Sequence, residues 1–96
     1  LMKGEWSFWN SNGILIENGY YHMGRPQGEH SGWYGSGKRK WIINYLSGKL
    51  NGSYVYWHEN GQVEISGEYS NGQKIGTWNK WDSDGLLTEQ KLYESY

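Results

Sequence analysis

The sequence has no cysteine, a single proline and no long hydrophobic run. Without cysteine, neither a disulfide nor a thiolate-bound metal can stabilise a chain of 96 residues, a small size for building a closed core. No run approaches the ~20 apolar residues of a membrane-spanning helix. Nine basic and ten acidic residues nearly cancel, and this balance disfavours nucleic acid as a partner, because duplex-binding proteins carry a basic excess.

Large aromatic residues are abundant by contrast, with seven tryptophans and nine tyrosines. Each such side chain can bury roughly 150–250 Å² of surface. At about 25 cal/mol per Å², full burial of one tryptophan is worth about 4–6 kcal/mol as an upper bound. We therefore expect aromatic contacts, rather than aliphatic ones, to hold the fold together.

A repeat of 24 residues runs through the chain without insertions. It places glycine, tryptophan, glycine and tyrosine at fixed positions of each unit. The members of the four series are Gly4, Gly28, Gly52 and Gly76; Trp9, Trp33, Trp57 and Trp81; Gly13, Gly37, Gly61 and Gly85; Tyr21, Tyr45, Tyr69 and Tyr93. The repeat predicts one domain over residues 1–96, built from units 4–27, 28–51, 52–75 and a shorter unit 76–96.

Each unit carries two turn signals. The first series is Asn12-Gly13, Ser36-Gly37, Asn60-Gly61 and Asp84-Gly85, and the second is Met23-Gly24, Ser47-Gly48 and Asn71-Gly72. Such dipeptides favour type I′ hairpin turns, which need positive φ at both central residues. Together with the series of Gly4, these turns account for 11 of the 15 glycines, so most of the glycine serves backbone geometry.

The segments between the turns have the length of strands. Residues 63–69 alternate cleanly, with Val63, Ile65, Gly67 and Tyr69 on one side. Gly67, like Gly19 in the same repeat position, leaves space for an aromatic ring to lie flat across the strand. We predict an all-β fold: an elongated, meandering antiparallel sheet of about eight strands in stacked hairpins. For residues 86–96 the pattern leaves open a final strand or a capping helix, and Glu89, Lys91 and Glu94 suit a polar cap.

The run from Glu68 to Leu86 resembles the MORN repeat, in particular its bacterial variant. The matching residues are Tyr69, Asn71-Gly72, Gly76, Trp78, Trp81 and Asp84-Gly85, and residues 45–61 repeat the pattern. The resemblance implies hairpins stacked in a twisted sheet. For function it implies either an antitoxin- or immunity-like role, as in bacterial proteins, or a scaffold linked to phospholipid binding, as in eukaryotic ones.

Motifs that would indicate an enzyme or a cofactor are incomplete. Residues 32–38 match part of a phosphate-binding loop, but Arg39 stands where a magnesium-binding Ser or Thr is needed. Residues 82–85 begin like a calcium loop and lack its remaining ligands. The three histidines occupy three different repeat positions, which gives no zinc pattern. We therefore expect no enzymatic activity, no cofactor and no metal.

The second unit departs most from the repeat. His30 replaces a Trp or Tyr, Gly32 replaces Phe or Tyr, and Ile43 replaces glycine. A basic segment follows its first turn. We predict a partner-binding site made of Trp33, Tyr34, Lys38, Arg39, Lys40 and Trp41. The alternative is that large and small side chains compensate for one another within the unit, and that the three cations only keep an exposed turn hydrated.

These observations favour a non-enzymatic protein-binding module that sequesters or inhibits another protein with an acidic patch. It would act as an antitoxin, an immunity factor or a virus-encoded inhibitor of a host system. One alternative is a glycan- or choline-binding module that uses exposed aromatic rings. Another is a surface for acidic lipids or nucleic acid around Lys38–Lys40. Because Met2-Lys3 leads straight into the first repeat, without an export signal, we expect a cytoplasmic location and no membrane contact.

Overall fold

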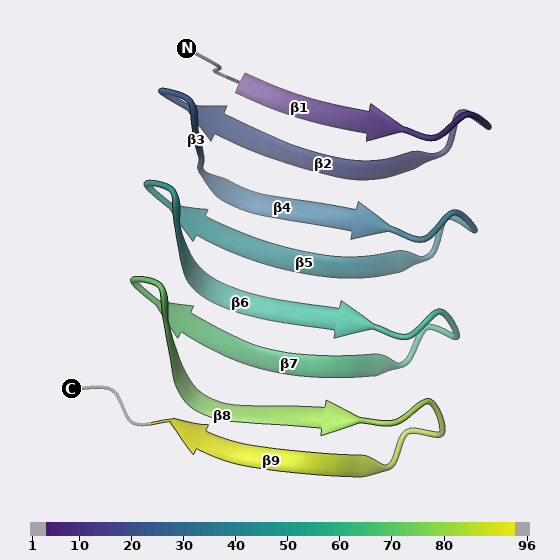
Figure 1. The fold of residues 1–96 in the computed structure, drawn as a ribbon, viewed down its shortest axis with the longest axis vertical. Helices are drawn as coiled ribbons and strands as arrows, with labels where there is room; N and C mark the ends of the chain where they lie inside the picture. Colours follow the sequence, from purple (N-terminus) through teal and green to yellow (C-terminus); the bar gives the residue numbers. More distant parts are fainter. Residues whose placement is uncertain (1–3, 94–96) are drawn as a thin grey trace.

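One antiparallel sheet of nine strands makes up the whole fold in a computed structural model, which describes residues 4–93 (Figure 1). The strands are β1 (Gly4–Trp9), β2 (Leu15–His22), β3 (Arg25–Pro26), β4 (Gly28–Trp33), β5 (Arg39–Leu46), β6 (Lys49–Trp57), β7 (Val63–Ser70), β8 (Gln73–Trp81) and β9 (Leu87–Tyr93). The spatial order is β1-β2-β4-β5-β6-β7-β8-β9, and the two-residue β3 pairs with β2. The predicted all-β meander of stacked hairpins is confirmed. Residues 87–93, where the sequence left strand or helix open, form strand β9; Glu94 lies outside the described residues.

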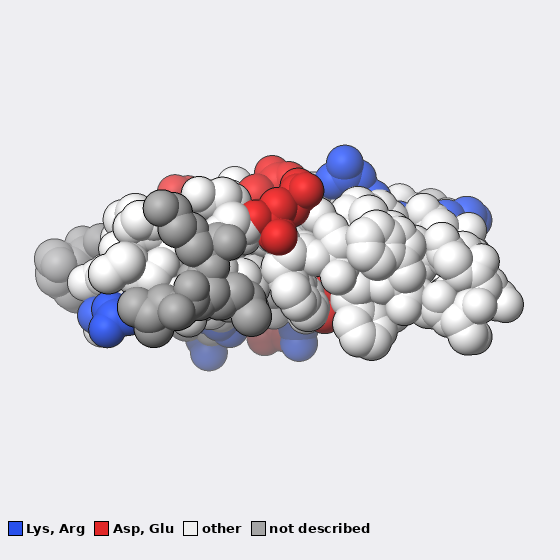
Figure 2. All heavy atoms as spheres, turned by 90° about the horizontal axis from the view of Figure 1, so that it is seen from above, with Lys and Arg blue, Asp and Glu red and all other residues white. Residues whose placement is uncertain are grey.

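The sheet is a single layer. The molecule measures 38 × 37 × 10 Å, and its thinness is visible in Figure 2. Among the described residues, Trp78 is the only hydrophobic side chain that is buried, with 7% of its surface exposed. The core is therefore a layer of half-buried rings on the sheet, and residues 4–93 place no second sheet or helix over it. Residues 4–93 contain no helix that could span a membrane.

The two series of turns differ in geometry. The link turns, at Met23-Gly24, Ser47-Gly48 and Asn71-Gly72, have positive φ at both residues, as type I′ requires. The other series, at Asn12-Gly13, Ser36-Gly37, Asn60-Gly61 and Asp84-Gly85, forms the tip turns. There only the glycine has positive φ, so the prediction of type I′ is wrong for these turns. In the tip turns that begin at Asn10 and Asp82, a side-chain oxygen accepts hydrogen bonds from two backbone N–H groups, at 2.9–3.1 Å. This favours a type I turn followed by the left-handed glycine.

Fourteen of the 15 glycines fall into two classes. All 11 glycines of the Gly4, tip-turn and link-turn series have positive φ, which confirms their predicted role in backbone geometry. Gly19, Gly32 and Gly67 do not, and each lies under a ring of the neighbouring strand. A Cβ atom at these three positions would overlap the rings of His30, Trp41 and Trp78 respectively. The expectation that Gly19 and Gly67 make room for a flat aromatic ring is therefore confirmed.

The strand register separates two faces. The aromatic face carries Trp6, Phe8, Tyr21, His30, Trp41, Tyr45, Tyr54, Tyr56, Tyr69, Trp78 and Tyr93. Consecutive ring centroids from Trp6 to Tyr45, and again from Tyr54 to Tyr93, are 5.0–6.4 Å apart. The opposite face bears a row of mainly polar residues, one from each long strand: Ser7, Asn18, Ser31, Ile42, Val55, Ser66, Asn79 and Gln90.

Side chains also tie each unit to the next. On the tip side, the hydroxyl of Tyr34 donates a hydrogen bond of 2.6 Å to the carbonyl of Trp57. His58, in the same repeat position, places its Nε2 2.9 Å from the carbonyl of Trp81. On the link side, the amide oxygens of Gln27 and Asn51 accept hydrogen bonds from the backbone of the following link turn, at 2.7 and 3.0 Å. These bonds fix the spacing of the units at both ends of the strands.

Candidate functional site

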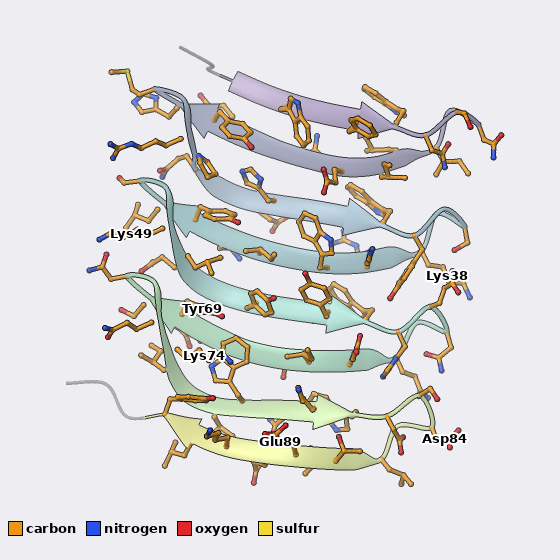
Figure 3. All side chains as sticks on the ribbon, viewed as in Figure 1. Lys38, Lys49, Tyr69, Lys74, Asp84 and Glu89 are labelled. Atoms are coloured by element: carbon orange, nitrogen blue, oxygen red, sulfur yellow. The ribbon has the colours of Figure 1, made fainter. Side chains whose placement is uncertain are left out.

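The residues predicted from the second unit do not form one surface. Lys38, Arg39 and Lys40 are exposed at the tip turn of the β4–β5 hairpin, where Lys38 is labelled in Figure 3. Trp33 directly follows Gly32, whose cross-strand partner is Trp41. Because consecutive side chains of a strand point to opposite faces, Trp33 lies on the face opposite to the aromatic face, on which Trp41 lies. The two tryptophans cannot contact the same flat partner surface.

Tyr34 and Trp41 both have contacts within the sheet. The hydroxyl of Tyr34 is bonded to the next unit. Burial raises the pKa of Tyr34, and the nearby carboxylates of Glu64 and Glu59 raise this pKa further. The ammonium of Lys40 lies 5.6 Å from the centre of the Tyr34 ring, so these two predicted residues do meet. Trp41 covers Gly32.

An exchange of volumes across one strand pair explains the irregular second unit. In the first and third units the large residue stands on the first strand, with Phe8 opposite Glu17 and Tyr56 opposite Ile65. The second unit reverses the order, with Gly32 opposite Trp41. Each of the three pairs thus supplies one large ring to this part of the sheet, which supports the alternative of exchanged volumes for Trp41.

His30 has a structural role in the same unit. Its ring covers Gly19, and its Nε2 lies 3.0 Å from the carbonyl of Tyr20. Trp78, the residue in the same repeat position, donates from its indole N–H to the carbonyl of Glu68 at 3.2 Å. The histidine thus reproduces the contact of the tryptophan, and the acceptor places the proton on Nε2.

A second group of side chains, which sequence reasoning did not single out, lies on the aromatic face over strands β7, β8 and β9. They surround a hollow of about 230 Å³ whose lining includes Tyr54, Ile65, Tyr69, Lys74, Trp78, Lys80, Glu89, Lys91 and Tyr93. We call it the lysine-rimmed hollow. Tyr69, Lys74 and Glu89 mark its position in Figure 3.

Register accounts for the arrangement of the hollow. Trp78 pairs with Lys91 and Lys80 pairs with Glu89, so these four side chains stand together on one face. The ammonium of Lys74 lies 4.7 Å from the centre of the Trp78 ring and 5.4 Å from that of Tyr93. Three cations therefore surround an aromatic centre that also contains the buried Trp78.

The charges of the hollow do not cancel. Glu89 is the one carboxylate among the lining residues, and its oxygen lies 3.6 Å from the ammonium of Lys80. Both of these side chains are about half exposed, so the ion pair is screened by solvent. The ammonium groups of Lys74 and Lys91 lie over aromatic rings of the hollow. The hollow therefore offers a positive potential beside apolar surface.

Two tyrosines of the aromatic face, Tyr45 and Tyr54, are held in the neutral form. Burial raises the pKa of Tyr54 well above its ordinary value, and a hydrogen bond with Tyr56 raises it further. Burial likewise raises the pKa of Tyr45. Tyr45 and Tyr54 therefore present neutral hydroxyls on this face.

A signal for the lysine-rimmed hollow was present in the sequence. Lys74 stands where the earlier units have Pro26 and Leu50. Lys80 aligns with Phe8, Gly32 and Tyr56, and Lys91 aligns with Gly19, Ile43 and Gly67. Comparing units position by position therefore finds three new cations. The strand register was needed to show that they share one face.

Among residues 4–93, no three histidine or acidic side chains are grouped so that they could hold a metal ion. Searches of the chain against protein-family models, curated proteins and solved structures found no match.

Proposed function

We propose that this chain is a MORN-like protein-binding module that sequesters or inhibits a partner protein bearing an acidic patch. The observation that carries the proposal is the aromatic face on a single-layer sheet. Sheets normally bury one face against a second layer, and here the described residues supply none. Tyrosine and tryptophan are the residues that contribute most at protein interfaces.

The charges suit the same kind of partner. Lys38 lies at one tip turn, Arg39 and Lys40 begin strand β5 beside it, and three more lysines rim the hollow on the aromatic face. Exposed cations at the rim of an interface mainly accelerate association with an acidic protein. In this proposal the rings supply affinity, and the cations steer the partner.

The test compares the two faces with one matched pair of variants. Phe8, 52% exposed, lies on the aromatic face, and Leu92, 69% exposed, lies on the opposite face. A protein captured from a native or candidate host lysate would be purified and titrated against the parent chain, Phe8→Glu and Leu92→Glu by calorimetry. Circular dichroism and urea unfolding would first establish that both variants are folded.

We expect stoichiometric binding that Phe8→Glu weakens at least about tenfold, because a charge placed on the contacting face must be desolvated, and that Leu92→Glu leaves within about twofold. A triple variant, Lys38→Ala, Arg39→Ala and Lys40→Ala, should lower the association rate and its salt dependence. Equal weakening by both single variants, or no protein that binds after purification, would contradict the proposal.

A further inference from the structure

We propose that the lysine-rimmed hollow binds an acidic segment of the partner protein, with an apolar side chain over the rings and neighbouring carboxylates on Lys74, Lys80 and Lys91. This inference rests on the proposed function and assigns it a site. It places the contact on strands β7 to β9 rather than at the tip turn of the second unit.

The repeat shows that the fold does not require these lysines. The other units have proline or leucine in place of Lys74. They have phenylalanine, glycine or tyrosine in place of Lys80, and glycine or isoleucine in place of Lys91. Those units form the same hairpins with the same register. Three uncharged positions have thus become cationic within one hollow, while the backbone stays the same.

The arrangement of the cations indicates the chemistry of the occupant. The ammonium of Lys74 rests on the rings of Trp78 and Tyr93, and that of Lys91 lies 5.4 Å from the Tyr93 ring. A carboxylate can bind to such an ammonium from the solvent side while the lysine keeps its contact with the ring. A quaternary ammonium ligand, by contrast, would have to displace Lys74 from both rings. The charge therefore favours an anionic occupant.

The size of the hollow favours a peptide segment. About 230 Å³ in an open depression accommodates one or two side chains, with the rest of the segment lying along the sheet. Tyr54 and Tyr69 provide apolar and neutral polar surface beside the cations. An acidic segment that carries one aromatic or aliphatic residue matches both the charge and the rings.

A competing explanation assigns the lysines only to the solubility of the terminal hairpin, as in the polar end units of repeat arrays. It predicts that the lysines bind no particular peptide. The test is an NMR titration of the ¹⁵N-labelled chain that follows the indole N–H of Trp78. The probes are three blocked pentapeptides with a central phenylalanine, flanked by aspartate and glutamate, by asparagine and glutamine, or by lysine.

We expect the acidic probe alone to shift the Trp78 signal together with amides of β8 and β9. Lys74→Gln with Lys91→Gln should weaken this binding about fivefold or more, because two charge-assisted contacts are lost. The matched control is Arg25→Gln with Lys49→Gln, which removes two exposed cations that do not line the hollow and should change the affinity less than about twofold.

Three results would overturn the inference: equal shifts with all three probes, unchanged affinity in Lys74→Gln/Lys91→Gln, or displacement of the acidic probe by inorganic phosphate or anionic lipid vesicles at equal charge. The first would support the solubility explanation and the last a general anion site.

The two proposals fail in different ways. If the captured partner binds Lys74→Gln/Lys91→Gln as it binds the parent, the hollow is not its site, although the protein-binding function stands. If the acidic probe binds in the hollow but no partner protein is found, the hollow remains a binding site for acidic segments and the proposed function fails.

Discussion

The indole of Trp41 lies over Gly32, its direct partner across the β4–β5 pair. Tyr56 and Ile65 fill the equivalent pair of the third unit with the large residue on the other strand. The same space is thus filled in two ways within one molecule. Mutations at the two positions of a pair should therefore have coupled effects on the free energy of unfolding.

Exchanging the pair tests this directly. Gly32→Tyr alone should destabilise the fold, because its Cβ would overlap Trp41, and Trp41→Ile alone should destabilise it by removing the ring. The double variant, which copies Tyr56 and Ile65, should recover most of the loss. Urea unfolding of the four chains should give a coupling energy of about 1–3 kcal/mol. Additive effects would contradict the volume exchange.

Gly67→Ala should destabilise the protein by about 1–3 kcal/mol, the usual cost of overpacking. The added methyl group would overlap the indole of Trp78, the one buried hydrophobic side chain among the described residues. Gly35→Ala is the matched control, since its Cβ would come no closer than 3.9 Å to a neighbour, the amide nitrogen of Asn10. It should change the free energy of unfolding by less than about 0.5 kcal/mol. Equal effects of the two changes would contradict the role of Gly67.

Met23→Asn should stabilise the protein by about 0.5–1 kcal/mol. Met23 has a φ of 55° in its link turn, a conformation that asparagine tolerates better than methionine. Its side chain is 61% exposed, so little packing is lost. Asn71, in the same position of the third unit, has a φ of 52° and shows that the turn accommodates asparagine. Thermal unfolding measures the change, and a lower melting temperature would speak against the argument.

Tyr34→Phe should cost about 0.5–1.5 kcal/mol, because the carbonyl of Trp57 loses the hydrogen bond it accepts from the hydroxyl. Tyr20→Phe is the control, because Tyr20 is 43% exposed on the opposite face. Its free energy of unfolding should remain within about 0.5 kcal/mol of the parent. If both variants behave alike in urea, the bond between units contributes nothing measurable.

The protein should lose stability in alkaline solution. Burial, and then the hydrogen bond with Tyr56, raises the pKa of Tyr54 above its ordinary value of 10.0, so the folded state favours the neutral phenol. This contribution is complete below pH 10.0 and is lost as the pH rises further, because the unfolded state releases its proton first. Urea midpoints should therefore fall above pH 10.0, and less steeply in Tyr54→Phe. An unchanged slope in that variant would refute the assignment to Tyr54.

Sequence reasoning reached much of this fold because the repeat gives each structural signal several times. The positions of the turns, the hairpins and the rings over Gly19 and Gly67 all follow from residue types in fixed register. The type of the tip turns did not follow. All four tip turns have the same backbone hydrogen bond, from the glycine N–H to the carbonyl three residues before it, with Asn10, Tyr34, His58 or Asp82 at that position, so the longer loop sets the turn and the dipeptide alone does not reveal it.

The predicted binding site shows a second limit. Trp33 and Trp41 belong to one hairpin, but β5 has an irregularity in register opposite Gly32 and Trp33, and separation along the chain does not tell which face each ring occupies. The three lysines of the hollow are spread over 18 residues, from Lys74 to Lys91, and only the pairing of β8 with β9 brings them together. Which side chains share a face therefore depends on register, and register required the structure.

The meander also has a kinetic consequence. Each long strand pairs only with its neighbours in the chain, and even the bond between units at Tyr34 and Trp57 spans 23 residues. The loops that must close during folding are therefore short, and their entropic cost is small. Folding can begin at any hairpin and extend outward one strand at a time, so this sheet should fold fast for an all-β protein and open from its outer strands, β1 and β9.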